Sequence, residues 1–421
     1  MKRHTARTLL AAGGITLVAA LTLTGCGGSG FDEPDAGPSG DGGGLTSSDD
    51  PLSILIGSSG DAETTAVKDA VAAWSADSGV DATVTAASDL TQELSQGFAG
   101  GSPPDVFYLG TEFLAGYAGN GSVLPYGDML ENKDDFYASL VENFTYDGEF
   151  ACAPKDFSTL QLIINKGLWE KAGLTDADVP TDWDSLAAAA KALTTDGTTG
   201  LVFSGEYARV GVFMAQAGGR LISEDGTEAT AASAENEEAL AYVKEHLTDG
   251  TFAYAADVGA GWGGEAFGKQ LGAMTIEGNW IRGALAKDAP DLKVKVVELH
   301  AGPKGKGTLM FTNCWGMAAD SPNQEAALDL IEYLTTAEQQ LAFSEAFGPM
   351  PSVQSAADQW RSDNPDLVAF LNGADYAQGV PTNDGISDVI ADFNAQLGTL
   401  KDGDPAEILG SVQSNLEAIV G

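Results

Sequence analysis

The chain has 421 residues and carries 61 acidic against 21 basic side chains, for a formal net charge of −40 at pH 7. This length is sufficient for two domains, each with a core of its own. A chain with this excess of negative charge repels the phosphate backbone of nucleic acids. We therefore expect no nucleic-acid partner and a solvated acidic surface.

The N-terminus is typical of an export signal. Three basic side chains occur within the first seven residues, and residues 8–24 then carry no charge. This run is shorter than the roughly 20 apolar residues of a spanning helix, and it predicts a signal peptide over residues 1–25. The signal ends Leu23-Thr24-Gly25-Cys26, which resembles the lipobox of bacterial lipoproteins. The resemblance implies lipidation of Cys26; a plain secretory signal is the alternative.

Residues 26–51 predict a flexible tether that begins at the lipidated Cys26. The segment is rich in Gly, Ser, Asp and Pro and has almost no apolar side chains. Such a segment cannot bury enough surface to offset the entropy lost on ordering. Together with the lipid, it predicts that the folded body is anchored at the outer face of the cytoplasmic membrane.

Cys152 and Cys314 are the two cysteines that remain once Cys26 is assigned to the lipid. In an exported protein an even pair predicts a disulfide, and two buried free thiols are the alternative. We expect no metal site, because only His246 and His300 remain outside the signal peptide.

From residue 52 onward, short apolar runs alternate with helical patterns. This alternation predicts a parallel sheet with helices on both faces. Ligands bind such sheets beyond the carboxyl ends of the strands, which indicates the loops at 58–63 and 108–113. The first predicted elements are a strand at 52–57, a helix at 66–74, a strand at 80–86, a helix at 90–98 and a strand at 105–109.

The alternation continues through the middle of the chain, and from Pro322 the pattern is mostly helical. Three tryptophans lie on predicted helix faces and are expected in the core: Trp74, Trp169 and Trp183. The remaining predicted elements are a strand at 160–164, a helix that a capping signal at 181–184 opens and that ends at 193, a strand at 201–204, a helix at 234–247, and strands at 273–276, 292–299 and 310–319.

The sequence offers no convincing catalytic motif. The run Gly263–Lys269 resembles a phosphate-binding loop, but Gln270 stands where a hydroxyl should hold Mg²⁺, and no strand precedes the run. Carboxylates are too numerous for the sequence to single out a glycosidase pair. We predict no catalytic residue and no cofactor, with a secreted glycosidase kept as an alternative.

Three segments carry a resemblance to one family. The first begins Ala153-Pro-Lys-Asp-Phe-Ser-Thr159 and continues to Leu174; the second is 273–280, which ends Gly278-Asn279-Trp280; the third is 318–348. In this order and spacing they resemble the family 1 extracellular solute-binding proteins, which include maltose-binding protein. The version Pro-Lys-Asp-Phe-Ser-Thr is similar to that of sugar binders of Gram-positive ABC importers.

The resemblance implies an α/β fold of type II with two discontinuous lobes that a hinge of several strands joins. It places crossings of the chain near Asp156, Asn313 and Gly348. Lobe 1 is then expected to comprise residues 52–156 plus 312–347, and lobe 2 residues 157–311 plus 348–421.

A sugar site needs aromatic rings for the apolar faces of the sugar and polar side chains for its hydroxyl groups. Trp280 is the best stacking candidate, because the Gly-x-Trp pattern of the family places it at the cleft; a core tryptophan is the alternative. Each further candidate has an ordinary structural alternative, either as a helix or turn cap or as a packing residue. The further candidates lie at a crossing, in a Gly-rich run or after predicted strands: Asp156, Trp262, Tyr108, Glu112, Tyr207, Arg209, Asp61 and Glu63.

The predicted function is capture of a mono- or oligosaccharide outside the cell and delivery to the transmembrane subunits of an ABC importer. We expect a monomer. The alternative from another class is a binding protein for an anion, a metal or a polyol. Anion sites need Arg or helix N-termini and iron sites need Tyr or His, whereas the candidates here are aromatic and acidic.

Overall fold

The structure, a computed structural model, describes residues 44–420, so the predicted signal peptide and Cys26 lie outside the described residues. Within the described range, no helix combines the length and the apolar character that crossing a bilayer requires.

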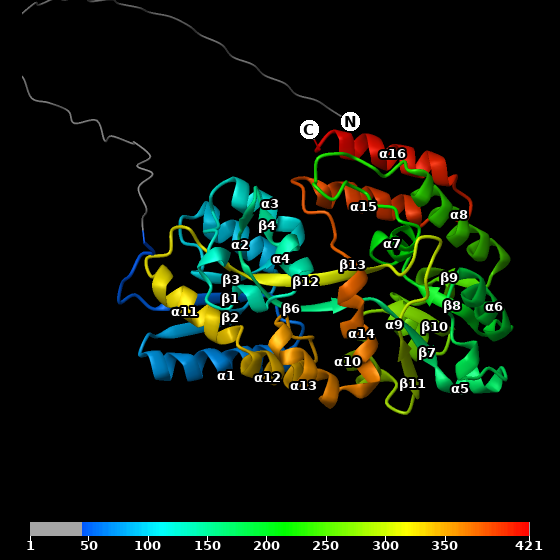
Figure 1. Ribbon diagram of the computed structural model, residues 1–421, viewed down its shortest axis with the longest axis horizontal. Helices are drawn as coiled ribbons and strands as arrows, with labels where there is room; N and C mark the ends of the chain where they lie inside the picture. The colour runs from blue at the N-terminus through cyan, green and yellow to red at the C-terminus, as the bar shows by residue number, and fades with distance from the viewer. Residues whose placement is uncertain (1–43, 421) are drawn as a thin grey trace, which may run out of the picture. The chain divides into compact units, whose positions relative to one another are not determined.

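The first sheet confirms the predicted alternation at the start of the body (Figure 1). Strands β1 (Leu52–Ile56), β2 (Ala82–Ala86) and β3 (Val106–Gly110) run parallel in the order β3-β1-β2. Helix α1 (Asp61–Ser78) connects β1 to β2, and α2 (Leu90–Ala99) connects β2 to β3.

Alternate side chains of β3 determine which helices cover which face of this sheet. Phe107 contacts Phe98 of α2, with ring centroids 5.5 Å apart, and Phe98 contacts Tyr117 of α3 (Thr111–Gly119). Tyr108 points the other way, toward α1, because successive side chains of a strand face opposite sides. Helices α11 (Gln324–Leu334) and α12 (Ala337–Phe347) pack on α1. We call this sheet and its helices lobe 1.

The second sheet has the order β11-β7-β10-β8-β9 and, with its helices, is called lobe 2. Strand β8 is parallel to β9 and β10, whereas β7 is antiparallel to β10 and β11. The strands are β7 (Gln161–Asn165), β8 (Thr199–Phe203), β9 (Phe252–Tyr254), β10 (Gly272–Glu277) and β11 (Val294–Val297).

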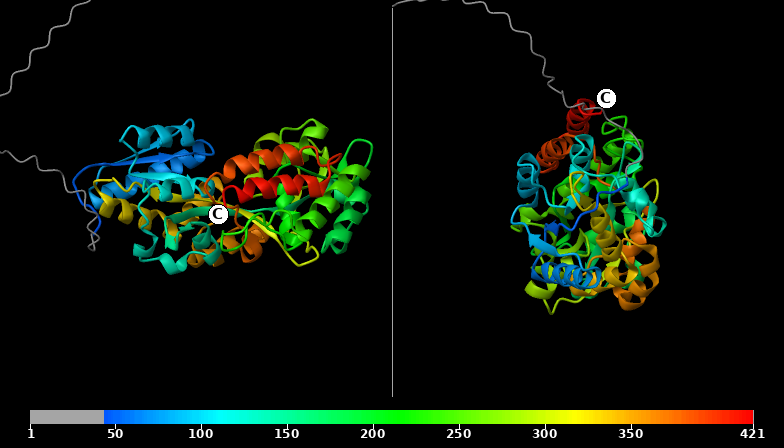
Figure 2. Two further views of the ribbon diagram at one scale, coloured as in Figure 1. Left: turned by 90° about the horizontal axis from the view of Figure 1, so that it is seen from above. Right: turned by 90° about the vertical axis from the view of Figure 1, so that its left-hand side faces the viewer.

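Helices surround the sheet of lobe 2, and the last two helices of the chain pack on α7 and α8 (Figure 2). The predicted helix that ends at 193 is present, and its N-cap is Asp182, within the predicted capping signal at 181–184. The run that resembles a phosphate-binding loop forms helix α9. The helices are α5 (Lys166–Lys171), α6 (Trp183–Leu193), α7 (Tyr207–Gln216), α8 (Ala234–Asp249), α9 (Gly263–Gly268), α10 (Ile281–Asp288), α15 (Ile386–Leu397) and α16 (Pro405–Glu417).

Two long strands connect the lobes. Strand β6 (Ala153–Thr159) leads from lobe 1 into β7, and β12 (Thr308–Met317) pairs with it in antiparallel register. β12 also pairs with β3 and with β13 (Ala377–Gln378). The ladder contains an irregularity between Asn313 and Cys314.

The three predicted crossing points lie on neighbouring segments of this connection. Asp156 and Asn313 are register partners of β6 and β12, and Phe157 pairs with Met350, two residues after Gly348. The exact limits of the two lobes stay a prediction. Helices α13 (Ala357–Asp363) and α14 (Val368–Asn372) follow the third segment, and their apolar side chains share one core with Phe157 and Met310.

Part of the predicted tether is bound to lobe 1. The backbone N–H of Thr46 donates to Gln324 Oε1 at 3.0 Å, and Thr46 O accepts from the N–H of Glu325 at 3.0 Å. Farther along, Asn323 Nδ2 donates to the carbonyl of Asp50. Residues 46–50 therefore attach to the N-terminus of α11, a correction to a tether that extends to residue 51.

The predicted core tryptophans are buried, with 4% of Trp74, 6% of Trp169 and 9% of Trp183 exposed. The predicted disulfide is also present. Cys152 and Cys314 are bonded, with 5.7 Å between their Cα atoms, and both are fully buried beside the paired strands β6 and β12.

Replacing both cysteines by alanine should lower the free energy of unfolding by about 2–5 kcal/mol. The bond closes a loop with a sequence separation of 162, and its loss restores conformational entropy to the unfolded chain. Chemical denaturation of the double variant measures the loss. Each single variant should match the double one; a double variant as stable as the parent would contradict a stabilising role.

Candidate functional site

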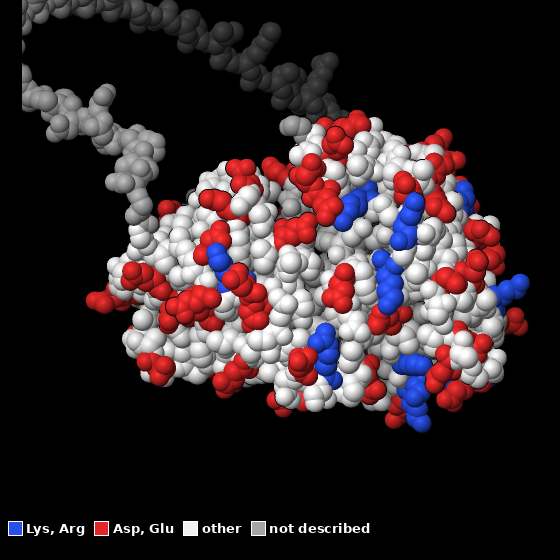
Figure 3. Space-filling model, in the orientation of Figure 1, with Lys and Arg blue, Asp and Glu red and all other residues white. Residues whose placement is uncertain are grey.

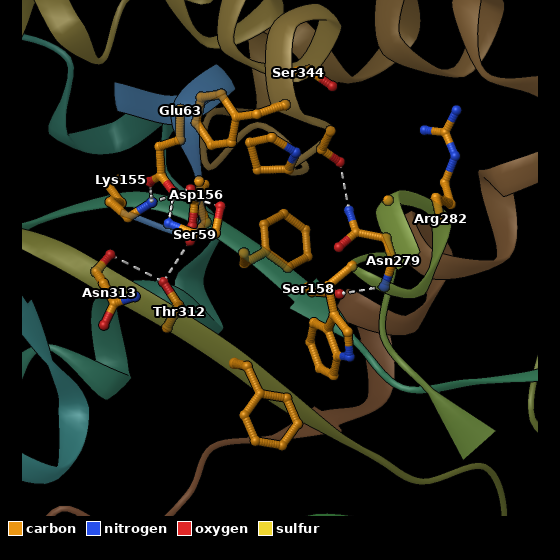
Figure 4. A pocket seen from close by; sticks show the side chains of 18 of the residues that line it. Ser59, Glu63, Lys155, Asp156, Ser158, Asn279, Arg282, Thr312, Asn313 and Ser344 are labelled. Carbon is orange, nitrogen blue, oxygen red and sulfur yellow. Dashed lines mark hydrogen bonds and ion pairs between the residues drawn. The ribbon is translucent and has the colours of Figure 1, made fainter. Parts of the chain in front are cut away.

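A cleft of about 2100 Å³ lies between the lobes. Side chains from α1, α10, α12 and the connecting strands line it, and Figure 4 shows polar groups from these elements directed into it. The cleft lies where the carboxyl end of β1 leads into α1, as expected for a sheet of this kind.

The lobe 1 wall contains a buried ion cluster. Lys155 Nζ lies 3.2 Å from Glu63 Oε1 and is also paired with Asp156. Tyr108 OH donates to Glu63 at 3.1 Å, and the ammonium of Lys155 lies 4.4 Å from the centroid of the Tyr108 ring. Ser59 donates to Glu63 through both its N–H and its hydroxyl, each at 2.7 Å. Two carboxyl groups therefore share one ammonium.

The pKa values of the cluster follow from burial and from this sharing. Burial raises the pKa of Glu63, but the charge of Lys155 and the Ser59 hydrogen bonds outweigh it, so the pKa lies below its ordinary value. Burial lowers the pKa of Lys155, and the two carboxylates reverse that effect and raise it. Burial raises the pKa of Asp156 although Lys155 opposes the shift. Asp156 is thus the less fully compensated carboxyl group.

Asp156 lies at the centre of the strands that connect the lobes. Its carbonyl oxygen accepts a 2.6 Å hydrogen bond from Thr312 Oγ1, which ties β6 to β12. Its carboxyl group faces the cleft, where Thr312 and Asn313 also line the wall (Figure 4).

The lobe 2 wall is built around Trp280, which directly precedes α10. The indole is 39% exposed, its Nε1 donates to Glu277 at 3.1 Å, and its ring meets the Phe311 ring edge-on with centroids 5.6 Å apart. Gly278 permits this position, because a Cβ there would collide with the indole ring. These contacts therefore fix the indole of Trp280, and its aromatic surface faces the cleft.

A second ion cluster lies behind Trp280. Arg209 donates to Glu206 at 2.8 Å and pairs with the fully buried Glu277, and its guanidinium carbon lies 5.6 Å from the indole centroid. Burial raises the pKa of Glu277, with Arg209 opposing the shift. Burial also raises the pKa of Tyr207, the first residue of α7.

One loop joins the lobe 2 wall to the connecting strands. The N–H of Asn279 donates to Ser158 Oγ at 3.0 Å, and its side-chain amide donates to the carbonyl of Gly348 at 2.8 Å. Both bonds are drawn in Figure 4. These bonds fix the position of Trp280 relative to the connecting strands. The Gly278-Asn279-Trp280 motif therefore stabilises the structure and also contributes a residue to the cleft wall.

Six of the nine predicted ligand-binding residues line the cleft: Trp280, Asp156, Glu112, Tyr207, Asp61 and Glu63. Asp61 and Glu112 are exposed in the first turns of α1 and α3. Whether any of the six contacts a ligand stays a prediction.

Three predicted residues do not line the cleft. Tyr108 is buried beneath Glu63, because its strand directs it into the lobe 1 core. Arg209 is held behind Trp280 by its two carboxylates. Trp262 lies across Gly264 and packs on the core around Phe267, since the Gly-rich run folds into α9 instead of an open loop.

Sequence reasoning missed several lining residues, among them Lys155, Asn279, Phe311, Asn313 and Phe347. Lys155 and Asn279 stand inside the family motifs beside predicted site residues, and that adjacency was the available signal. In the part of the chain that the structure describes, no group of three or more His, Cys, Asp or Glu side chains is arranged to hold a metal ion.

Replacing Lys155 by Met should lower the free energy of unfolding by about 3–5 kcal/mol, because two largely buried carboxyl groups lose their cation. Lys133→Met is the matched control. Its ion pair with Asp128 is exposed, so that loss should stay within about 1 kcal/mol. Denaturation of both variants at neutral pH provides the measurement, and equal losses would show that the cluster does not stabilise the fold.

Comparison with known proteins assigns the chain to a family. The family described as bacterial extracellular solute-binding protein matches residues 69–369, well over half of the chain. A binding protein from Brucella abortus (strain 2308) is 26% identical over 350 residues, which are 79% of this chain and 83% of that protein. The sn-glycerol-3-phosphate-binding periplasmic protein of Agrobacterium fabrum is 31% identical over 120 residues, which are 26% of this chain and 27% of that protein.

Solved structures show the same fold. The cyclic alpha-maltosyl-1,6-maltose binding protein from Arthrobacter globiformis has a TM-score of 0.77 at 21% identity, covering 88% of this chain and 98% of that one. An ABC substrate-binding protein from Listeria monocytogenes in complex with cycloalternan has a TM-score of 0.74 at 23% identity, with the same coverage. The two lobes therefore form the predicted type II fold, and the chain belongs to the bacterial extracellular solute-binding proteins.

Proposed function

We propose that the protein captures a mono- or oligosaccharide in its interlobe cleft and delivers it to the transmembrane subunits of an ABC importer. The exposed indole of Trp280 in the cleft wall carries this proposal. Aromatic rings stack on the apolar face of a sugar, and an indole combines such an apolar face with a polar N–H edge.

The polar lining supports the same ligand class. Asp156, Thr312 and Asn313 bring carboxyl, hydroxyl and amide groups to the connecting strands, and the Trp280 and Phe311 rings line the same cleft. Sugar hydroxyls both donate and accept hydrogen bonds, so a mixed set of this kind suits them. Of the proteins with the same fold, one binds cyclic alpha-maltosyl-1,6-maltose and another forms a complex with cycloalternan.

The alternatives are less well supported. The relative that binds sn-glycerol 3-phosphate matches only 26% of this chain, and carboxylates predominate in the cleft. The family consists of binding proteins, which favours capture without turnover. Incubation with a bound sugar distinguishes a glycosidase, because an enzyme would consume the sugar and a binding protein would return it intact.

The function is tested first by a thermal-shift panel of mono- and oligosaccharides and then by Trp280→Ala. A ligand at 100 times its dissociation constant stabilises the fold by roughly 2.7 kcal/mol, which raises the melting temperature. Trp280→Ala should weaken the binding of a sugar hit about thirtyfold in calorimetry, because a large aromatic leaves a binding site. Its melting temperature without sugar should remain near that of the parent.

Trp74→Ala is the matched control for this experiment. Trp74 lies in the lobe 1 core with 4% of its surface exposed, so its loss should lower the melting temperature and leave the affinity of the folded protein unchanged. Normal affinity in Trp280→Ala would remove that residue from the site. A panel without any sugar hit would reject the proposed function.

We further propose that the protein is a lipoprotein, processed before Cys26 and held at the outer face of the cytoplasmic membrane. The basic start, the uncharged run and the Leu23-Thr24-Gly25-Cys26 sequence support this.

Replacing Cys26 by Ala should move the protein from the membrane fraction to the medium or leave its precursor unprocessed, because the thiol that carries the lipid is absent. Fractionation of expressing cells followed by immunoblotting distinguishes release into the medium from retention of the precursor. Ser29→Ala, which changes a residue close to Cys26 and leaves every thiol in place, is the control and should leave the distribution unchanged. A Cys26→Ala protein that is still processed and membrane-bound would contradict lipidation at this residue.

A further inference from the structure

The lobe 1 wall of the cleft holds one basic side chain between two carboxyl groups, because Lys155 lies between Glu63 and Asp156. In lobe 2, Arg209 lies between Glu206 and Glu277, but this cluster stays behind Trp280 and does not line the cleft. Both cations are therefore engaged by the protein's own carboxylates, and the lobe 1 wall has one carboxyl group more than Lys155 can neutralise.

The rest of the cleft does not restore the balance. Two further basic side chains line it, Arg282 and Lys287, and both are exposed on α10. Figure 4 shows Arg282 apart from the Lys155 cluster. Exposed charges are screened by solvent and salt far more than partly buried ones. The carboxyl groups of the lining number seven, and five of them are exposed as well, which leaves Glu63 and Asp156 as the two that solvent screens least: Asp61, Glu63, Glu112, Asp156, Glu338, Glu345 and Asp363.

The excess carboxyl group of lobe 1 is accessible to a ligand. Asp156 binds Lys155 through Oδ2, and among the described residues no donor forms a hydrogen bond with Oδ1. Its side chain is 16% exposed and lines the cleft, whereas Glu63 is 4% exposed and lies behind it. Asp156 Oδ1 is thus a hydrogen-bond acceptor that has no cation of its own. It lies in a partly desolvated wall, beside a second carboxylate.

A positively charged donor on the ligand would supply that missing cation. An N⁺–H···O⁻ hydrogen bond is about twice as strong as a neutral one, and the low polarity of a partly buried wall increases the difference. A carboxylate or phosphate on the ligand would instead meet like charge at Asp156 and Glu63, which opposes binding at this wall.

From this charge arrangement, and resting on the proposed function, we propose that the bound solute is an amino sugar, a saccharide whose free protonated amine binds Asp156. Trp280 in the lobe 2 wall and Phe311 on β12 contact the apolar face of the ring. Saccharides that carry a carboxylate or phosphate in place of the amine are disfavoured, because Asp156 repels them.

The test compares sugars of the same ring types in cationic, neutral and anionic forms. Mono- to tetrasaccharides of glucosamine, galactosamine and mannosamine are measured by calorimetry beside their N-acetylated forms and beside the uronic acids of the same rings. The free amine should bind about tenfold more tightly than its N-acetylated partner, since an ion pair replaces a neutral contact. The advantage should shrink in about 0.5 M salt, and the uronic acids should not bind.

Two variants assign the preference to Asp156. Asp156→Asn leaves Lys155 and Glu63 as a balanced pair, so the fold should persist, and a melt checks this. In this variant the amine and its N-acetylated partner should bind within about twofold of each other. Glu149→Gln, an exposed carboxylate of β5 (Glu149–Phe150) outside the cleft, should retain the full tenfold difference.

The outcomes separate this inference from the proposed function. Tight binding of neutral sugars with no gain from the amine would overturn the inference and keep the function. Binding of a uronic acid as tight as that of its amine, or an amine preference that survives in Asp156→Asn, would also overturn it. Absence of binding by every sugar in all three charge forms would reject the proposed function together with the inference.

Discussion

The antiparallel pairing of β6 with β12 is the constraint on which the rest of the molecule depends. Both strands belong to the sheet of lobe 1 and lead directly into lobe 2, so their register sets the relation between the lobes. Asp156 and Asn313 are partners in that register, and the Thr312 hydroxyl bonds to the Asp156 carbonyl. The polar centre of the cleft is therefore part of the connection itself, and a change in the pairing would change the site.

The charges of the cleft are as closely organised as its backbone. The two buried basic groups near the cleft are each held by carboxylates and an aromatic ring, Tyr108 for Lys155 and Trp280 for Arg209. This arrangement keeps two cations in place at little exposure and leaves the lobe 1 wall electronegative. The same excess extends over the surface, since the face in Figure 3 carries many more acidic than basic side chains. The negative charge at the site thus adds to the negative charge of the whole surface.

Much of the fold could be predicted from the sequence, because apolar runs that alternate with helical patterns reflect local physics. The strand at 105–109 and the helix ending at 193 appear within two residues of their predicted limits. The residues of the candidate site were harder to predict than the fold. Tyr108 and Arg209 lie at or after predicted strands, as site residues do. The side chain of Tyr108 faces the core, and Arg209 is held by a local ion pair with Glu206 and a tertiary one with Glu277. Lys155 was missed because a buried lysine depends on partners that are distant in sequence.

The attachment of Thr46 to α11 determines where a mechanical load would enter the body. Its hydrogen bonds end on Ser321, Gln324 and Glu325, at the N-terminus of a helix that packs on α1. A force applied to the chain at this point passes into lobe 1 and reaches lobe 2 only through the connecting strands. In a protein anchored through Cys26, as proposed, lobe 1 would be the fixed platform and lobe 2 the free arm, so drag on the anchored molecule would not have to work against the opening and closing of the cleft.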